Sequence, residues 1–206
     1  MTGSTAERVR RCMDLFDAAN SEDPRSEADG QPKELTYARR MSEWLDRLEP
    51  NAPEEVRLAV RAQHIRRWEI PRRRYPKGRV GYLRWRKKLG QFHAETAGRI
   101  MRTCGFDDGT VSRVQGIIRK ERFRIDPWAQ LLEDVACLVF LDYYFEAFAD
   151  DQEEDGMVNI LRKTWRKMSR RGQDAAKTIE YSPCCAALLQ TALAPDQGTS
   201  GRPRKR

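Results

Sequence analysis

Residues 127–149, PWAQLLEDVACLVFLDYYFEAFA, form the most apolar stretch of the chain. Apolar side chains fall on nearly every face of a helix drawn through this stretch, which is typical of a helix that is buried on all sides. Asp126 can cap the first turn, and Pro127 fits the first helical position. The stretch therefore predicts a central helix around which shorter helices pack.

Amphipathic patterns lie on both sides of this central segment. Apolar residues that recur with the helical period, together with capping residues and glycine or proline stops, mark the ends of each pattern. The helices predicted in this way cover residues 6–19, 35–48, 51–70, 83–101, 107–123, 157–172 and 183–193.

The remaining segments read as connections. Residues 20–34 and 71–82 contain prolines and polar residues, which predicts loops. No stretch alternates with period two for long enough to form a sheet. We therefore expect an all-α, single-domain helical bundle over residues 1–195 and a disordered basic tail over residues 196–206.

Composition limits the class of protein. Of the 206 residues, 39% are hydrophobic and 34% charged, the net charge is +8, and no apolar run is long enough to span a bilayer. The first residues lack the apolar core of a secretory signal. The five cysteines match no zinc pattern, and we expect reduced thiols in a soluble, cytoplasmic protein with no membrane partner. The positive charge permits an anionic partner.

Two histidines and two acidic residues are the first candidates for chemistry. His64 and His93 lie on apolar stripes of predicted helices, and Glu133 and Asp134 lie inside the central helix. A carboxylate buried there must be hydrogen-bonded, paired or bound to a metal, because its desolvation is otherwise costly. His64, His93 and Asp134 could bind one metal ion. The alternative is a structural network of hydrogen bonds among the same side chains.

A basic segment is the second candidate. Residues 66–88 hold eleven Arg or Lys residues, interleaved with four aromatic residues. Arginine forks match phosphate oxygens, and aromatic rings can stack on a base. The residues that we expect to hold an anion here are Arg72, Arg73, Arg74, Lys77 and Arg84. The alternative is a solvated face whose arginines pair with acidic residues.

A third stretch resembles a known motif by chance. Lys167–Arg171, KMSRR, is similar to the KMSKS loop of class I aminoacyl-tRNA synthetases. That chemistry requires a nucleotide-binding fold with a parallel sheet, and the chain has no strand pattern and no glycine-rich loop. We expect the end of a basic helix instead.

Several long motifs resemble an uncharacterised family, the domain of unknown function 4202, which occurs in fungi and bacteria. The resemblance covers about residues 8–193, and the name of the family implies no function. The motifs that carry it are ELTYARRMSEWL, LAVRAQHIRRWEIPRRRYPKGRVGYLRWR, FHAETA, LLEDVACLVFLDYYF and ILRKTWRKMS.

The order of the elements is also distantly similar to the HD superfamily of metal-dependent phosphohydrolases. The resemblance matches His64, His93 and Asp134 to metal ligands and implies one divalent metal, manganese, iron or zinc. Three positions depart from the family pattern. Ile65 stands where an Asp is expected, no His lies near residues 37–40, and Lys120 stands near the place of a further His. Lys120 could hold an anion where a metal once sat.

These observations lead to three hypotheses about the function of the protein. The first is an HD-like metal-dependent hydrolase that acts on a phosphorylated small molecule or nucleotide, with Glu133 or Asp134 as general base. The alternative is a non-catalytic helical module that binds RNA, tRNA or another anion through the basic segment. The third is a helical scaffold for another protein.

Overall fold

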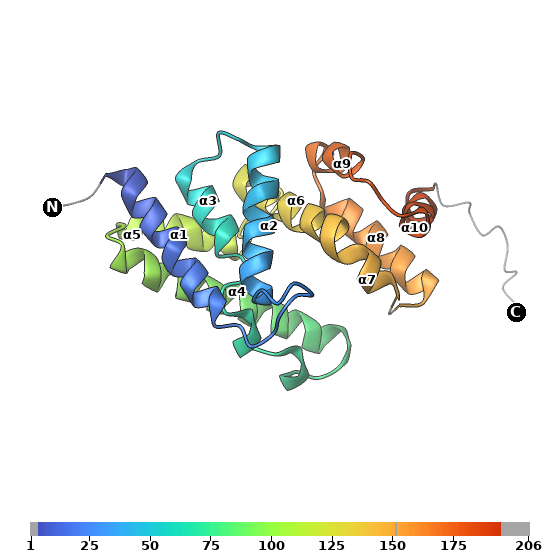
Figure 1. Cartoon of the computed structure of the whole chain (residues 1–206), viewed down its shortest axis with the longest axis horizontal. Coiled ribbons are helices and arrows are strands. Elements are labelled where there is room, and N and C mark those ends of the chain that lie inside the picture. The colour runs from blue at the N-terminus through green and yellow to red at the C-terminus, as the bar shows by residue number, and fades with distance from the viewer. Residues whose placement is uncertain (1–3, 151, 195–206) are drawn as a thin grey trace, which may run out of the picture.

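The computed structural model describes residues 4–150 and 152–194 (Figure 1). Every regular element within these ranges is helical, and the one β-type pairing there is an isolated bridge between Ser26 and Pro32. The predicted all-α bundle is confirmed for this part of the chain. The helices are α1 (Thr5–Ser21), α2 (Lys33–Leu48), α3 (Glu54–Arg61), η1 (Arg67–Glu69), η2 (Arg72–Arg74), α4 (Gly78–Thr103), α5 (Asp108–Ile118), α6 (Pro127–Val139), η3 (Phe140–Tyr144), α7 (Phe145–Asp150), α8 (Glu154–Lys167), α9 (Arg170–Ala176) and α10 (Pro183–Leu193).

Helix α6 is the central element, as the sequence predicts. Figure 1 shows it running through the middle of the molecule, and it packs against α2, α3, α5, α8 and α9. Asp126 caps it by accepting a hydrogen bond from the backbone amide of Trp128 at 2.9 Å, and Pro127 occupies the first turn. Leu132 and Leu138 are fully buried, and each contributes about 1.5–3 kcal/mol by burial.

The apolar stretch does not continue as one regular helix. After Val139 the chain makes a π-helical segment, η3, and then resumes as α7. A π turn takes up an extra residue and rotates the side chains that follow. Phe140, Tyr144 and Phe148, each four residues apart, all line one side of the large cavity described below.

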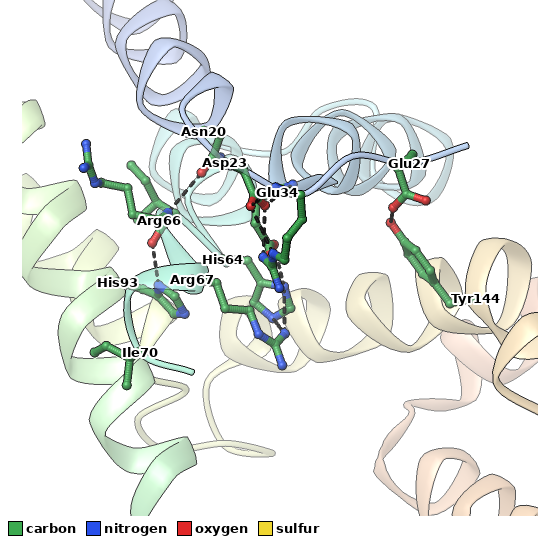
Figure 2. Close-up of polar contacts among 12 residues, drawn as sticks. Asn20, Asp23, Glu27, Glu34, His64, Arg66, Arg67, Ile70, His93 and Tyr144 are labelled. Carbon is green, nitrogen blue, oxygen red and sulfur yellow. Dashed lines mark hydrogen bonds and ion pairs between the residues drawn. The ribbon is translucent and has the colours of Figure 1, made fainter. Parts of the chain in front are cut away.

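The predicted helix over 51–70 is shorter than expected. Helix α3 ends at Arg61, and Arg66 adopts a left-handed conformation with φ of 53°. Tertiary partners replace the helical hydrogen bonds here. The amide of Arg66 donates to the side-chain oxygen of Asn20, and the carbonyl of Ile65 bonds the ring of His93 (Figure 2). His64 therefore lies in a turn and not on the face of a helix.

Two other helix boundaries differ from prediction. Helix α4 begins at Gly78, inside the predicted loop, and it continues without a break through Gly90. The predicted helix over 157–172 is divided in two, because Met168 is extended (ψ 144°) and Ser169 caps a new helix, α9. The Ser169 hydroxyl accepts a hydrogen bond from the amide of Gly172 at 3.2 Å.

The cysteines and the C-terminal helix agree with the sequence-based predictions. All five cysteines are free thiols, and only Cys184 is exposed. The predicted helix over 183–193 is confirmed as α10. The expected tail over 196–206 lies outside the described residues. No described helix is long and apolar enough to cross a bilayer.

Candidate functional site

Two neighbouring cavities lie between α2, the turn after α3, α4, the connection from α5 to α6, the continuous segment α6–η3–α7, and α8. Their volumes are about 510 Å³ and about 70 Å³, and we call them the main cavity and the recess. Five residues line both, namely Gln63, His64, Arg67, Arg86 and Lys120. A hollow of similar size near Trp44 holds one cation, Arg47, beside Asp142 and Glu180, and it gathers none of the predicted site residues.

The two histidines lie together at these cavities. Their ring centroids are 5.8 Å apart, and the ring of His64 is stacked on Tyr37 at 4.1 Å. Burial, with help from Arg67 and other cations, keeps the pKa of His64 well below its ordinary value. Burial and the neighbouring His64 lower the pKa of His93 to about 3. Both imidazoles are therefore neutral near pH 7.

Arg67 lies against His64. One of its terminal nitrogens is 3.1 Å from Nδ1 and 2.9 Å from Nε2 of the imidazole, so the positive guanidinium group lies against the ring and opposes its protonation (Figure 2). The Arg67 guanidinium also lies over Trp85, with 5.2 Å between its central carbon, Cζ, and the ring centroid.

Glu34, at the start of α2, supplies a carboxylate on the same wall. Its Oε2 is 3.5 Å from Nδ1 of His64, and its Oε1 accepts a hydrogen bond from Arg25 at 2.8 Å. Arg25 is also paired with Asp23 at 2.9 Å, and Asp23 accepts from the backbone amide of Glu34 (Figure 2). Burial raises the pKa of Glu34 above its ordinary value. This network fixes the mouth of the cavity beside His64.

Lys120 and Glu133 form an ion pair deep in the main cavity. The Lys120 ammonium donates a short hydrogen bond to Glu133, and Lys167 lies 3.5 Å from the other oxygen of the same carboxylate. Burial acts to raise the pKa of Glu133, but the two lysines outweigh it, and the net pKa lies below the ordinary value. Glu133 is therefore an anion held between two cations, and it is poorly placed to act as a base.

The charge of the main cavity is positive. Its lining holds six basic side chains, Arg25, Lys33, Arg67, Arg86, Lys120 and Lys167, against two carboxylates, Glu34 and Glu133. Lys33, Arg67 and Arg86 have no carboxylate within ion-pair distance among the described residues. Several cations that line one concave surface attract an anion more strongly than the same cations spread over the molecule would.

The recess contains buried polar atoms without partners. Nδ1 of His93 lies 2.8 Å from the Ile65 carbonyl, so this nitrogen carries the proton and Nε2 is an acceptor. That Nε2 and the side-chain oxygen of Gln63 have no hydrogen-bond partner within the described chain. Buried polar atoms are rarely left unsatisfied, because the desolvation of each costs about 1–3 kcal/mol. A donor from water or a ligand fits this place.

Asp134 lies apart from the histidines. Its carboxylate accepts hydrogen bonds from the amide and hydroxyl of Ser169 and from the side chain of Gln130. Gly172 sits directly against it, since a Cβ built on that glycine would be 2.8 Å from the Asp134 Cγ. The side chain therefore anchors the start of α9, and it lines neither cavity.

The residues present do not fit the predicted metal ion. His64 and His93 are close together, but the third predicted ligand, Asp134, is engaged with Ser169. Over residues 4–150 and 152–194, no group of three or more His, Cys, Asp or Glu side chains is arranged to hold a metal ion. The structure does not assemble the expected set of His64, His93 and Asp134.

The predicted anion-binding residues divide into two groups. Lys120 lines both cavities, whereas the other five line neither. Arg72 donates to the carbonyls of Tyr75 and Pro76 and so braces its own loop. The remaining four are Arg73, Arg74, Lys77 and Arg84, all exposed on the outer surface.

Sequence reasoning missed several lining residues. Glu34 and Arg25 come from the connection before α2 and its first turn, which gave no signal beyond a charged helix start. Arg67 and Arg86 belong to the basic segment, and nothing in the spacing of Arg67 distinguished it from its neighbours. Arg86 could have been singled out because it follows Tyr82 by four residues, on the same helical face.

Comparison with known proteins gives a family and no activity. The family model described as "Domain of unknown function (DUF4202)" matches residues 10–189, which is most of the chain. No curated protein and no solved structure matches the chain.

Proposed function

Because the chain belongs to the DUF4202 family, whose description assigns no activity, its function has to be inferred from its own site, and we propose that it binds a nucleotide-type phosphorylated small molecule in the main cavity. The observation that carries this proposal is the excess of cations there, six basic side chains against two carboxylates. Among the described residues, Lys33, Arg67 and Arg86 are the three of these without a carboxylate at ion-pair distance. Lys33 and Arg86 can donate to phosphate oxygens directly, and Arg67 can donate through the part of its guanidinium that does not contact His64.

The aromatic side of the cavity favours a ligand with a planar group. Tyr82, Phe140, Tyr144 and Phe148 all contribute to its lining. Phe148 and Tyr82 contact the rings of Phe140 and Trp85, and they remain 38% and 43% exposed, so each still offers ring surface to a ligand. Stacking of a base on an aromatic ring contributes about 1–3 kcal/mol. A phosphorylated ligand with a base would use both the cations and the rings.

The recess favours a ligand that also carries a hydroxyl group. Nε2 of His93 and the oxygen of Gln63 are acceptors, so a bare phosphate dianion would not satisfy them. A ribose hydroxyl or a protonated phosphate oxygen would donate to either one. A nucleoside phosphate therefore matches the cations, the rings and the two unsatisfied acceptors together.

Metal-dependent hydrolysis of such a ligand, the reaction that the HD resemblance implies, has no support from the placement of the residues. Asp134 is occupied by its hydrogen bonds from Ser169, the cap of α9, and Glu133 is held by two lysines. The proposal is accordingly one of binding, and no bond-breaking step is assigned to these side chains.

Calorimetric titration of the full chain tests the proposal. The ligands are adenosine and guanosine mono-, di- and triphosphates, the parent nucleosides, ribose 5-phosphate and inorganic phosphate. We expect the nucleoside phosphates to bind more tightly than either the nucleosides or inorganic phosphate. Arg86→Ala should weaken binding about 10-fold or more, since a hydrogen bond to a charged group contributes about 1.5–3 kcal/mol.

A matched control lies on the same helix. Arg99 is exposed, has no carboxylate at ion-pair distance among residues 4–150 and 152–194, and lines neither the main cavity nor the recess. Arg99→Ala should leave the affinity unchanged. Equal affinities of the wild type and Arg86→Ala, or no nucleoside phosphate binding at millimolar concentration, would overturn the proposal.

A further inference from the structure

A second cationic feature lies outside the cavities, on the segment from the end of η1 into α4. Residues 70–94, IPRRRYPKGRVGYLRWRKKLGQFHA, contain nine Arg or Lys residues and no Asp or Glu. Within the described part of the chain, none of these nine has a carboxylate at ion-pair distance. Arg66, just before the segment, differs because it is paired with both Glu22 and Glu69. The alternative reading, in which the arginines of residues 66–88 pair with acidic residues, therefore holds for Arg66 and not for these nine cations among the described residues.

The first half of α4 presents these charges on one continuous surface. Gly81, Trp85 and Leu89 point into the protein, and the residues between them are exposed. In Figure 1 the start of α4 and the segment before it form the lower edge of the molecule, with no other element beneath them. The exposed residues of this surface, which we call the α4 face, are Arg79, Val80, Tyr82, Leu83, Arg84, Arg86, Lys87 and Lys88.

The α4 face is continuous with the mouth of the main cavity. Tyr82 and Arg86 belong to both, because each is exposed on α4 and also lines the cavity. Arg79 stands three residues before Tyr82 and seven before Arg86, so these three side chains lie in one row along the helix. Leu83 and Lys87 form the adjacent row. A chain-like ligand could follow these rows out of the cavity.

The chemistry of the α4 face matches a strand of nucleic acid. Unpaired arginines bind phosphate oxygens through two parallel hydrogen bonds. Tyr82 and Leu83 are 43% and 55% exposed among these cations and offer surfaces for stacking bases. Val80 and Leu83 are the only large aliphatic side chains exposed there, which is too little apolar surface for a stable anchor in a bilayer.

We propose that the α4 face binds single-stranded nucleic acid, with the terminal nucleotide of the strand in the main cavity. The second half of this statement rests on the proposed function, and the first half does not. The cations of the α4 face neutralise backbone phosphates, so the affinity depends steeply on salt, while the cavity recognises the phosphorylated end.

Fluorescence anisotropy with the full chain tests the α4 face. The probes are single-stranded RNA oligonucleotides of about ten nucleotides, with and without a 5′-phosphate, within the range of site sizes known for such surfaces. The variant replaces Arg79, Arg84 and Lys87, none of which lines a cavity, with alanine. The charge-matched control replaces Arg10, Arg11 and Arg170, which are exposed on α1 and α9.

The expected result is a change in salt dependence. The slope of log Kd against log salt should fall by about two for the α4 variant, because each phosphate that a cation neutralises on a single strand adds about 0.7 to the slope. The control should keep the slope of the wild type. The α4 variant should bind mononucleotides as the wild type does, and the wild type should prefer the 5′-phosphorylated probe.

Each other outcome has a defined meaning. If the α4 variant and the control lose the same affinity, the α4 face is not a specific surface and this inference fails. Binding to phosphatidylserine vesicles without binding to RNA would also overturn it, in favour of a membrane surface. If RNA binding depends on the α4 face but no mononucleotide binds, the α4 face stands and the proposed function fails.

Discussion

The carboxylate of Asp134 accepts hydrogen bonds from both the backbone amide and the hydroxyl of Ser169, with 2.7 Å between the amide nitrogen and Oδ1. The two residues are 35 positions apart in the chain. The contact ties the central helix to the start of α9 and determines where the chain turns after α8. Asp134 is therefore a structural residue of the bundle.

Asp134→Asn should destabilise the protein by about 1–3 kcal/mol. The single oxygen of the asparagine amide can accept only in the place of one carboxylate oxygen, and its NH2 group then faces a donor in the place of the other. Urea unfolding followed by circular dichroism measures the loss. Ser169→Ala, which removes only the hydroxyl, should cost about 0.5–2 kcal/mol. Unchanged unfolding midpoints in both variants would contradict the anchoring role, and unaltered nucleotide affinity in Asp134→Asn would support its separation from the site.

Gly172→Ala should also destabilise the protein, since the added Cβ would lie 2.8 Å from the Asp134 Cγ and 2.9 Å from Oδ1. The loss should be about 1–3 kcal/mol, as for other overpacked positions. Gly156, in α8, is the matched control because a Cβ there meets nothing within 4 Å. Gly156→Ala should stabilise by about 0.5–1 kcal/mol. Thermal unfolding of the two variants should give shifts of opposite sign.

Lys120→Met should leave Glu133 with Lys167 as its remaining cation and lower the free energy of unfolding by up to about 3 kcal/mol. Glu133→Gln in the same chain should restore much of this loss, because the buried carboxylate is then neutral. A double-mutant cycle in urea measures the coupling. Purely additive effects would argue against the ion pair. The restored double variant should still bind nucleoside phosphates more weakly than the wild type.

His93 should make stability depend on pH. Its pKa is lowered to about 3 in the folded chain from an ordinary value near 6.5. The folded state therefore favours the neutral ring. The resulting stability is fully present above about pH 6.5 and is lost as the pH falls toward 3. His93→Asn, which can still donate to the Ile65 carbonyl, should reduce the loss between pH 7 and 5 by about 2 kcal/mol. Parallel profiles for wild type and variant would refute this.

Metal analysis should find no ion that depends on His64. After equilibration with manganese, iron or zinc and removal of loose ions, elemental mass spectrometry should give the same low content for the wild type and His64→Ala. The reason is that no third ligand joins the two histidines in the described chain. Near-stoichiometric metal that is lost in His64→Ala would restore the HD-like hydrolase hypothesis.

The helices of the fold could be predicted from the sequence because the features that determine where each helix lies are local. Apolar periodicity and caps such as Asp126 act within one helix, and α6 begins where this residue predicts. The end of α3 could not be predicted from the sequence. Its stop at Arg61 depends on Asn20 and His93, which reach the chain from α1 and α4. A tertiary partner overrode a helical pattern that was locally consistent.

The site was readable only in part for the same reason. His64, His93 and Lys120 meet at the recess, as their types and order suggested. Asp134 does not join them, because its partner Ser169 lies in a break between helices that the pattern did not mark. The basic segment was recognised as a whole, but its division between the cavity and the outer face follows from the position of Tyr82 and Arg86 on α4.

Lys120 has a positive φ of 56°, a backbone conformation that favours glycine. A residue with a Cβ gives up about 1–2 kcal/mol to adopt it. Selection for thermal resistance alone would thus favour Lys120→Gly, with Glu133→Gln to compensate for the missing charge. Such a protein would lose the backbone strain at this position, and under the proposed function it would bind nucleoside phosphates more weakly. Variants designed for higher thermal stability should therefore retain Lys120.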